Sequence, residues 1–244
     1  MKNLVTRGTI DTSNKYAGGI VGEASDNASI LNCESHVAIN STVSGDGTHG
    51  GIIGLTGGTG TIRVTNALFA GSINGDQTTC CGGICGWSGN SGQNVMTNCL
   101  VVGDITTNPE SCATFSRNSS NFTIVNTYYK DGFYEIYDNN KGTKVTASQL
   151  ASGEMAYRLN GNKQGQGVAW YQNVGTDAYP TIVPNEQYIV YMQEDGTFSN
   201  VPTAIEGITA DNRENTAIYD LTGRRVEKAR KGLYIINGKK VLVK

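Results

Sequence analysis

The sequence predicts an all-β fold: a right-handed parallel β-helix, or β-solenoid, of about four coils, then a small α+β capping segment with one helix, then a short C-terminal β module. Three observations predict it. A glycine-rich block recurs at a fixed spacing, a second block containing asparagine follows each copy, and the composition is rich in glycine and poor in charge. Glycine accounts for 32 of 244 residues and charged residues for 16%, which indicates turn-rich β structure. Disorder is disfavoured because Ile, Val and Leu recur at regular positions.

The glycine-rich block has the pattern Gly-Gly-Ile-x-Gly and begins at Gly18, Gly50 and Gly82, so successive copies are 32 residues apart. A degenerate fourth copy is assigned to 113–116. One repeat of this kind cannot bury its apolar face alone, whereas coils stacked about 4.8 Å apart align equal positions into continuous ladders. The glycines are expected to supply positive φ or close backbone approach at the corners. The competing interpretation is an antiparallel β-sandwich with coincidental Gly-Gly pairs.

The second block, hydrophobic-x-Asn, defines further columns, and an isoleucine follows its asparagine by seven residues in most copies. The asparagines are expected to form an amide ladder in which each side chain donates to the next coil. That column consists of Asn32, Asn66, Asn98 and Asn126, with Asn3 at the same offset. Two apolar ladders are predicted, one of Ile10, Ile39, Ile73 and Ile105, the other of Ile20, Ile52, Ile84 and Phe115.

The six cysteines permit disulfides in an exported protein, and their spacing does not match a metal site. Cys33 and Cys99 share a column but lie two coils apart, roughly 9–10 Å, which is too far for a disulfide. Both are interpreted as small buried hydrophobes. Cys81 and Cys112 fall on adjacent coils if the fourth copy aligns with the third, so they are the candidate disulfide, with free thiols as the alternative.

These blocks resemble the GLUG-type repeats of bacterial surface proteins. The resemblance rests on Gly-Gly-Ile-x-Gly, the hydrophobic-x-Asn-Cys block and the Gly-x-Ile that follows, and covers roughly residues 1–127. It implies an extracellular, adhesin-like protein of no single defined activity.

A capping segment is assigned to 128–192, because repeat character stops near residue 127 and a short helix and an aromatic segment suit the shielding of a last coil. Residues 146–160 have the helical pattern, with Thr146 or Ser148 as the N-cap and Gly161 as the stop. Sugar stacking is the functional alternative for the aromatic residues. The candidates are Trp87, Trp170, Tyr171 and Tyr179.

Residues 193–203 are interpreted as a linker and 204–244 as a β module, in which Asn237-Gly238 between two β-prone runs predicts a hairpin. The module resembles the C-terminal sorting domain of the type IX secretion pathway of Bacteroidetes, which is usually longer. The residues that carry the resemblance are Tyr219, Asp220, Gly223, Arg224, Gly232 and Tyr234. The resemblance implies a small β-sandwich recognised by the export machinery and often removed at the surface.

Catalytic chemistry finds little support in the sequence. Glycosidases need two carboxylates about 5–10 Å apart, and the acids of the repeat region do not recur in one column. His36 and His49 are the only histidines and are interpreted as structural or solvated. We therefore expect no enzyme activity, no cofactor and no metal site. A carbohydrate-active β-helix enzyme, a lyase or glycosidase, or the stalk of one, is the alternative.

The charge balance excludes bulk attraction to nucleic acid, since the formal net charge is −2. No apolar run is long enough for a transmembrane helix, and no signal peptide is visible, so the chain is interpreted as a fragment or a truncated gene model. The expected function is a non-catalytic display or binding scaffold, extracellular or on the outer-membrane surface. Its expected partners are a glycan or a surface protein, and the export machinery through the tail.

Overall fold

The computed structural model describes residues 1–117, 122–132, 142–202, 218–236 and 239–243. The chain divides into two compact units, Met1–Thr203 and Ala204–Lys244, and each is described by itself.

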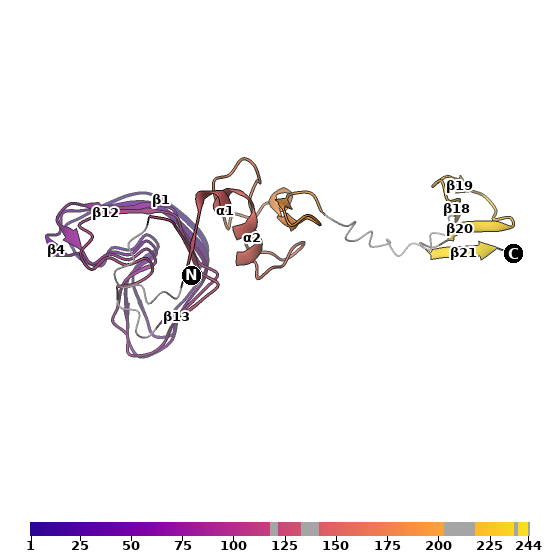
Figure 1. Ribbon diagram of the computed structural model, residues 1–244. Helices are drawn as coiled ribbons and strands as arrows, with labels where there is room; N and C mark the ends of the chain where they lie inside the picture. The colour runs from indigo at the N-terminus through magenta and orange to yellow at the C-terminus, as the bar shows by residue number, and fades with distance from the viewer. Residues whose placement is uncertain (118–121, 133–141, 203–217, 237–238, 244) are drawn as a thin grey trace. The chain divides into compact units, whose positions relative to one another are not determined.

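The first unit is a β-solenoid of about four coils, built from parallel strands that stack on equal positions of the repeat (Figure 1). Its main wall is a ten-stranded parallel sheet. The strands of this wall are β1 (Lys2–Thr12), β3 (Ser29–Ser41), β6 (Ile62–Phe69), β7 (Ser72–Gly75), β10 (Asn94–Thr97), β11 (Leu100–Val101), β12 (Asp104–Thr107), β13 (Phe122–Val125), β14 (Tyr128–Lys130) and β15 (Thr143–Val145). A second wall contains β2 (Val21–Ser25), β5 (Ile53–Gly57) and β9 (Cys85–Ser88), and a short one contains β4 (Gly45–Asp46) and β8 (Thr78–Thr79).

The predicted interior ladders are confirmed by the strand register. Ile10 pairs with Ile39, Ile39 with Ile73, and Ile73 with Ile105. In the second ladder Ile52, Ile84 and Phe115 are buried and Ile20 packs against them. The bridge from Gly82 to Ala113 confirms the degenerate fourth copy. Parallel coils therefore translate the sequence repeat directly into columns of packed side chains.

The asparagine column provides the positive φ at one corner, a role that the sequence assigned to glycine. Its members have φ between 50° and 57°, a left-handed conformation that Asn tolerates better than most residues. The glycines of the Gly-Gly-Ile-x-Gly blocks serve close backbone approach, the second of the two roles predicted for them. A Cβ on Gly50 would lie 1.8 Å from the carbonyl oxygen of Ile53, and one on Gly51 would lie 2.2 Å from that of Gly83.

The solenoid wall continues past the predicted boundary at residue 127. Tyr128 and Tyr129 of β14 pair with Leu100 and Val101, and β15 then pairs with β14. Aromatic residues thus replace aliphatic ones in the same columns. The last coil therefore lacks the sequence pattern of the repeat although it keeps the structure.

The capping segment contains two short helices, α1 (Ala147–Ala151) and α2 (Glu154–Leu159), in place of the single predicted helix, and a 3-10 turn, η1 (Glu186–Tyr188). Thr146 caps α1 in a capping box with Gln149. Gly153, at φ 91°, separates the helices because its left-handed backbone cannot continue a helix.

The helices lie beside the main wall of the solenoid and not across its last coil (Figure 1). Leu68, Leu100 and Tyr128 alternate with interior residues and so point outward, where they form a second core with Leu150 and Leu159. The helices therefore do not shield the last coil, whereas β15, at the start of the same segment, pairs with β14 and covers its edge. We call residues 146–202 the lateral cap.

Part of the predicted linker 193–203 belongs to the lateral cap. β16 (Tyr191–Met192) and β17 (Phe198–Ser199) form an antiparallel hairpin, and Phe198 packs against Tyr157 at a ring-centroid distance of 5.5 Å.

The second unit contains an antiparallel sheet in the order β19 (Arg225–Val226), β18 (Ile218–Tyr219), β20 (Gly232–Ile236) and β21 (Lys239–Val243). β20 and β21 pair from Ile236 and Lys239 outward, as a two-residue hairpin requires, while the predicted turn at Asn237-Gly238 lies outside the described residues. No helix in the described ranges is long and apolar enough to cross a membrane.

We expect Gly54→Ala to destabilise the first unit by about 1–3 kcal/mol, because a Cβ there would lie 1.9 Å from the carbonyl oxygen of Tyr16. Gly22 occupies the same repeat position, but its Cβ would lie 3.5 Å from that atom. Gly22→Ala is the matched control and should change stability by less than about 0.5 kcal/mol. Urea unfolding of both variants measures this, and equal midpoints would show that close approach does not constrain the column.

Candidate functional site

Two adjoining cavities lie between the asparagine column and the lateral cap. One, of about 370 Å³, has Asn66 and Asn98 on the solenoid side. The other, of about 140 Å³, has Asn3 and Asn32 there. Both are bounded on the cap side by Val168 and Ala169, so together they follow four successive rungs of the column. We call this depression the amide groove.

The solenoid side of the groove is the predicted ladder of hydrogen-bonded amides, but each amide donates to the preceding coil and not, as predicted, to the next. Asn32 donates to Asn3 at 3.2 Å, Asn66 to Asn32 at 2.8 Å, and Asn98 to Asn66 at 3.1 Å. The ladder ends at Asn126, which donates to Asn98 at 2.8 Å and to the Arg158 carbonyl at 2.7 Å. A primary amide has two N–H donors and two acceptor lone pairs. Each inner rung therefore keeps one donor and one acceptor beyond those that the ladder uses.

The opposite wall is held in place by Asn160, the C-cap of α2. Its Oδ1 accepts from the backbone N–H groups of Ala169 and Trp170 at 2.9 Å, and its Nδ2 donates to the Trp170 carbonyl at 2.8 Å. The Tyr171 hydroxyl donates to the Val168 carbonyl at 2.9 Å. Side-chain hydrogen bonds thus fix this loop beside the ladder.

The groove lining contains almost no charge. Among its lining residues only Lys163 is charged, and it is exposed. The larger cavity has Gln164 and Gln166 beside its two asparagines, and the smaller has Val5, Tyr171 and Val183 beside its own two. Such a surface can donate and accept hydrogen bonds and cover an apolar face, but its lining includes no carboxylate.

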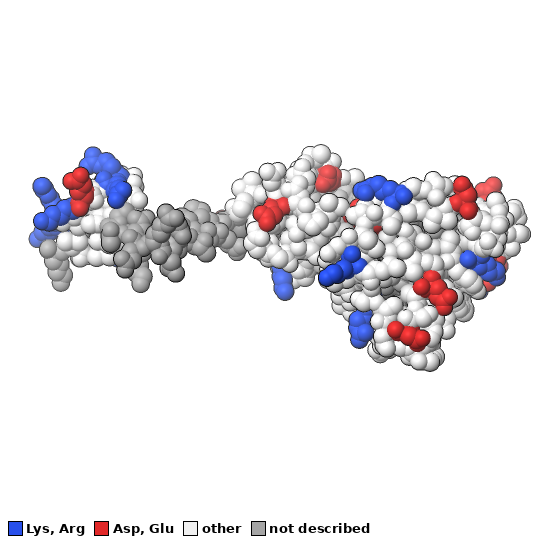
Figure 2. All heavy atoms as spheres, turned by 180° about the vertical axis from the view of Figure 1, so that it is seen from behind, with Lys and Arg blue, Asp and Glu red and all other residues white. Residues whose placement is uncertain are grey.

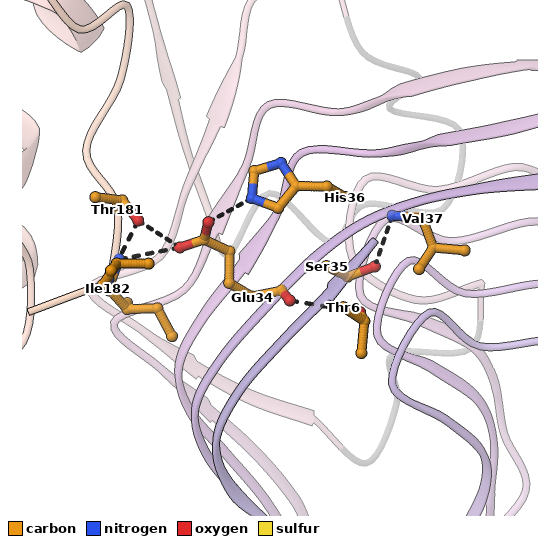
Figure 3. Close-up of polar contacts among 8 residues, drawn as sticks. Thr6, Glu34, Ser35, His36, Val37, Thr181 and Ile182 are labelled. Carbon is orange, nitrogen blue, oxygen red and sulfur yellow. Dashed lines mark hydrogen bonds and ion pairs between the residues drawn. The ribbon is translucent and has the colours of Figure 1, made fainter. Parts of the chain in front are cut away.

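Glu34 attaches the lateral cap to the solenoid (Figure 3). It occupies the outward column of Leu68 and is 1% exposed. Its Oε2 accepts from the Thr181 hydroxyl at 2.5 Å and from the Ile182 N–H at 3.2 Å. Its Oε1 accepts from Nε2 of His36, which follows it on β3. A buried carboxylate needs such partners. We therefore interpret Glu34 as a structural tie between the solenoid and the lateral cap.

The predicted aromatic candidates have different environments. Trp170 is 0% exposed in the second core, so it has no face for a ligand and that expectation is wrong. Trp87 is covered by the Arg117 guanidinium, 4.8 Å from its ring centroid. Tyr179 packs on the second core. Tyr171 lines the amide groove.

Ser41 and His49 form a buried pair with Nε2 2.8 Å from the serine Oγ, a spacing found between nucleophile and base in hydrolases. The Nδ1 of His49 accepts from the backbone N–H of Ala17 at 3.1 Å. The ring proton is therefore on Nε2, and the imidazole donates to Ser41 and cannot take its proton. Burial lowers the pKa of His49 to about 4, which keeps the ring neutral.

Two acids of the repeat region are bound to separate basic partners. Asp46 pairs with Arg117 at 2.8 Å and Lys15 at 3.6 Å, and Asp104 pairs with Lys130 at 2.5 Å. Burial acts to raise the pKa of Asp46, but hydrogen bonds from Thr48 and Arg117 outweigh it and leave the pKa lowered. The described part of the chain contains no group of three or more His, Cys, Asp or Glu arranged to hold a metal ion.

All six cysteines are buried thiols. Cys81 and Cys112 lie on adjacent coils as predicted, and the Cys81 N–H donates to the Cys112 sulfur at 3.4 Å. A hydrogen bond between the thiols lowers the pKa of Cys112 and raises that of Cys81. Cys33 and Cys99 are completely buried, in keeping with their interpretation as small hydrophobes.

A second polar ladder was missed in the sequence. It follows the isoleucine column by one residue, and Asn40 donates to Asp11 at 2.8 Å, Asn74 to Asn40 at 2.9 Å and Thr106 to Asn74 at 2.7 Å. The signal was the polar residue after each isoleucine. This ladder borders an open depression of about 520 Å³.

Comparisons of the chain with protein-family models, curated proteins and solved structures find no match. The functional interpretation therefore depends on the geometry of the chain itself.

We expect Glu34→Leu to destabilise the first unit by about 1–3 kcal/mol. Leucine would match Leu68 in the column but would leave the Ile182 N–H without its acceptor. Glu34→Gln is the control, because its carbonyl oxygen can still accept from Ile182 and Thr181, and it should lose less. Chemical unfolding and hydrogen exchange at Ile182 are the measurements. A Leu variant as stable as the parent would contradict the role of Glu34 as a tie.

His49 predicts acid sensitivity. Because its folded pKa of about 4 lies below the unfolded value of 6.5, the unfolded state binds more protons between these values, so stability falls as pH decreases through that window. The loss is on the order of 3 kcal/mol. The measurement is urea unfolding from pH 7 to pH 4 for the parent and for His49→Gln. Parallel curves for the two proteins would contradict the assignment.

Proposed function

We propose that the chain is a non-catalytic binding and display scaffold on a bacterial cell surface. The observation that carries the proposal is the amide groove, a two-walled depression along four rungs of an asparagine ladder whose lining includes no carboxylate. Hydrogen-bonding amides beside an apolar patch suit binding, whereas glycoside hydrolysis needs a pair of acids. The groove is the binding site of the proposed scaffold.

The solenoid supports the display part of the proposal. Each coil is hydrogen-bonded to the next over several strands, so the ladder side chains are held at regular positions. On the face seen in Figure 2, charges of both signs are scattered over the first unit, without one dominant sign. Contact with a surface ligand would then depend on shape and hydrogen bonding. Similarity to GLUG-type repeats is part of the same proposal.

The second unit supports the proposed export signal. Asp220 Oδ1 accepts from the backbone N–H groups of Thr222 and Arg224 at 3.0 Å, and from the Thr222 hydroxyl at 2.6 Å, which lowers the pKa of Asp220. Gly223 completes this turn at φ 82°, where a side chain would be strained. The Tyr234 hydroxyl accepts from the Arg230 N–H at 3.3 Å. The residues that resemble a type IX sorting domain therefore include those that shape a turn.

Surface display tests this proposal. The chain would be expressed in a Bacteroidetes host behind a native signal peptide, with and without residues 204–244, and protease accessibility on intact cells measured. We expect display to require the tail and to fall in Asp220→Ala, which removes the turn contacts, but not in Lys228→Ala, an exposed control. Display that ignores deletion of the tail would contradict the sorting role.

A further inference from the structure

We propose that the amide groove binds a neutral polysaccharide, with the sugar chain lying along the asparagine ladder. The inference rests on the proposed function, since it names the ligand class of the same site. It is tested on purified protein, so it can fail while surface display holds.

The first argument is the linear repeat of the groove. Four asparagines, from Asn3 to Asn98, stand one coil apart, so they span roughly 14 Å at about 4.8 Å per coil. Both cavities lie along this line and meet at Val168 and Ala169. A row of equivalent groups over this length suits a polymer with repeating units better than a single small molecule.

The second argument is hydrogen-bonding capacity. Each inner rung retains one N–H and one lone pair after its ladder bonds. A sugar hydroxyl both donates and accepts, so it can bond to such an amide at every step. An extended peptide would instead need free backbone groups to pair with. The Asn98 N–H is already bonded to the Val125 carbonyl at 3.1 Å, and neighbouring coils use the adjacent strands.

The third argument is the apolar end of the groove. Tyr171 lies there with Val5 and Val183, which are 38% and 42% exposed. Aromatic rings pack well on the C–H face of a sugar ring, and the bond from the Tyr171 hydroxyl to the Val168 carbonyl fixes the ring before a ligand arrives. A wall ordered in advance loses less side-chain freedom on binding.

The fourth argument is charge. Lys163 is the one charged residue among those lining the groove, and it is exposed to solvent. A polyanion would find a single solvated cation, which is worth little, and a polycation would find no carboxylate. A neutral chain leaves no charge unpaired.

Affinity electrophoresis of the purified chain in gels containing soluble neutral polysaccharides tests the proposal. The probes are barley β-glucan, xyloglucan, galactomannan and hydroxyethylcellulose, with polygalacturonate as the acidic comparison. We expect retardation by at least one neutral probe and none by polygalacturonate. Titration calorimetry with the retarding probe then gives the affinity.

Val168→Arg places a long charged side chain in the groove where the two cavities meet, and Tyr171→Ala removes the aromatic wall. Each should weaken binding about tenfold or more. Val201→Arg is the matched control, since Val201 is 67% exposed and does not line the groove. Tyr171→Phe keeps the ring and should retain most of the affinity. Circular dichroism melts confirm that each variant folds.

Retardation that is lost in Val168→Arg and kept in Val201→Arg supports the site. The proposal would be overturned by no retardation by any neutral probe, by equal affinity for the folded Val168→Arg variant, or by stronger retardation by polygalacturonate. Displacement of the probe by an unstructured peptide at similar concentration would also overturn it, because the groove would then bind peptide chains.

Discussion

The first unit depends on one constraint, the in-register parallel hydrogen bonding of each coil to the next. That register requires the coil backbones to approach closely at the glycine blocks, where a Cβ on Gly18 would lie 2.5 Å from the backbone nitrogen of Gly54 on the next coil. Once the backbones are in register, equal positions of the repeats must coincide, so isoleucine meets isoleucine inside and asparagine meets asparagine at the corner. The core, the amide ladder and the outward column on which the lateral cap packs all follow from this in-register stacking of coils.

The asparagine corner serves two purposes at once. Each asparagine adopts a left-handed conformation that turns the chain, and each side chain hydrogen-bonds to the next coil. A glycine would also permit the turn but has no side-chain amide to bond with. The choice of asparagine therefore places a regular row of polar groups on the surface as a by-product of stability. It is this row that makes the corner a candidate binding surface.

Features that repeat along the chain could be predicted, and features that depend on one distant contact could not. The ladders of Ile10 and Asn32 follow from spacing alone. The position of the lateral cap depends on the hydrogen bond between Glu34 and Ile182, which are 148 residues apart. No periodic pattern in the sequence predicts this contact. Trp170 is a candidate for sugar stacking only as the alternative to capping, and the second core, which the sequence does not predict, buries it completely. The polar ladder of Asn40 is visible in the sequence as a polar residue after each isoleucine, a pattern separate from the apolar columns.

The lateral position of the cap explains why a groove exists at all. A segment placed across the last coil would cover the strand edges and leave the asparagine corner open to solvent on all sides. Packed instead on the outward column of Leu68, Leu100 and Tyr128, the cap places the Val168–Ala169 loop opposite the ladder and creates a second wall. A buried carboxylate at Glu34 is then understandable, although an apolar residue there would avoid the cost of burying a charge. Its carboxylate anchors Thr181 and Ile182, which lie next to Val183 and are bridged to Tyr171, through directional hydrogen bonds. It therefore fixes the position of the wall, whereas apolar packing alone would leave that position less defined.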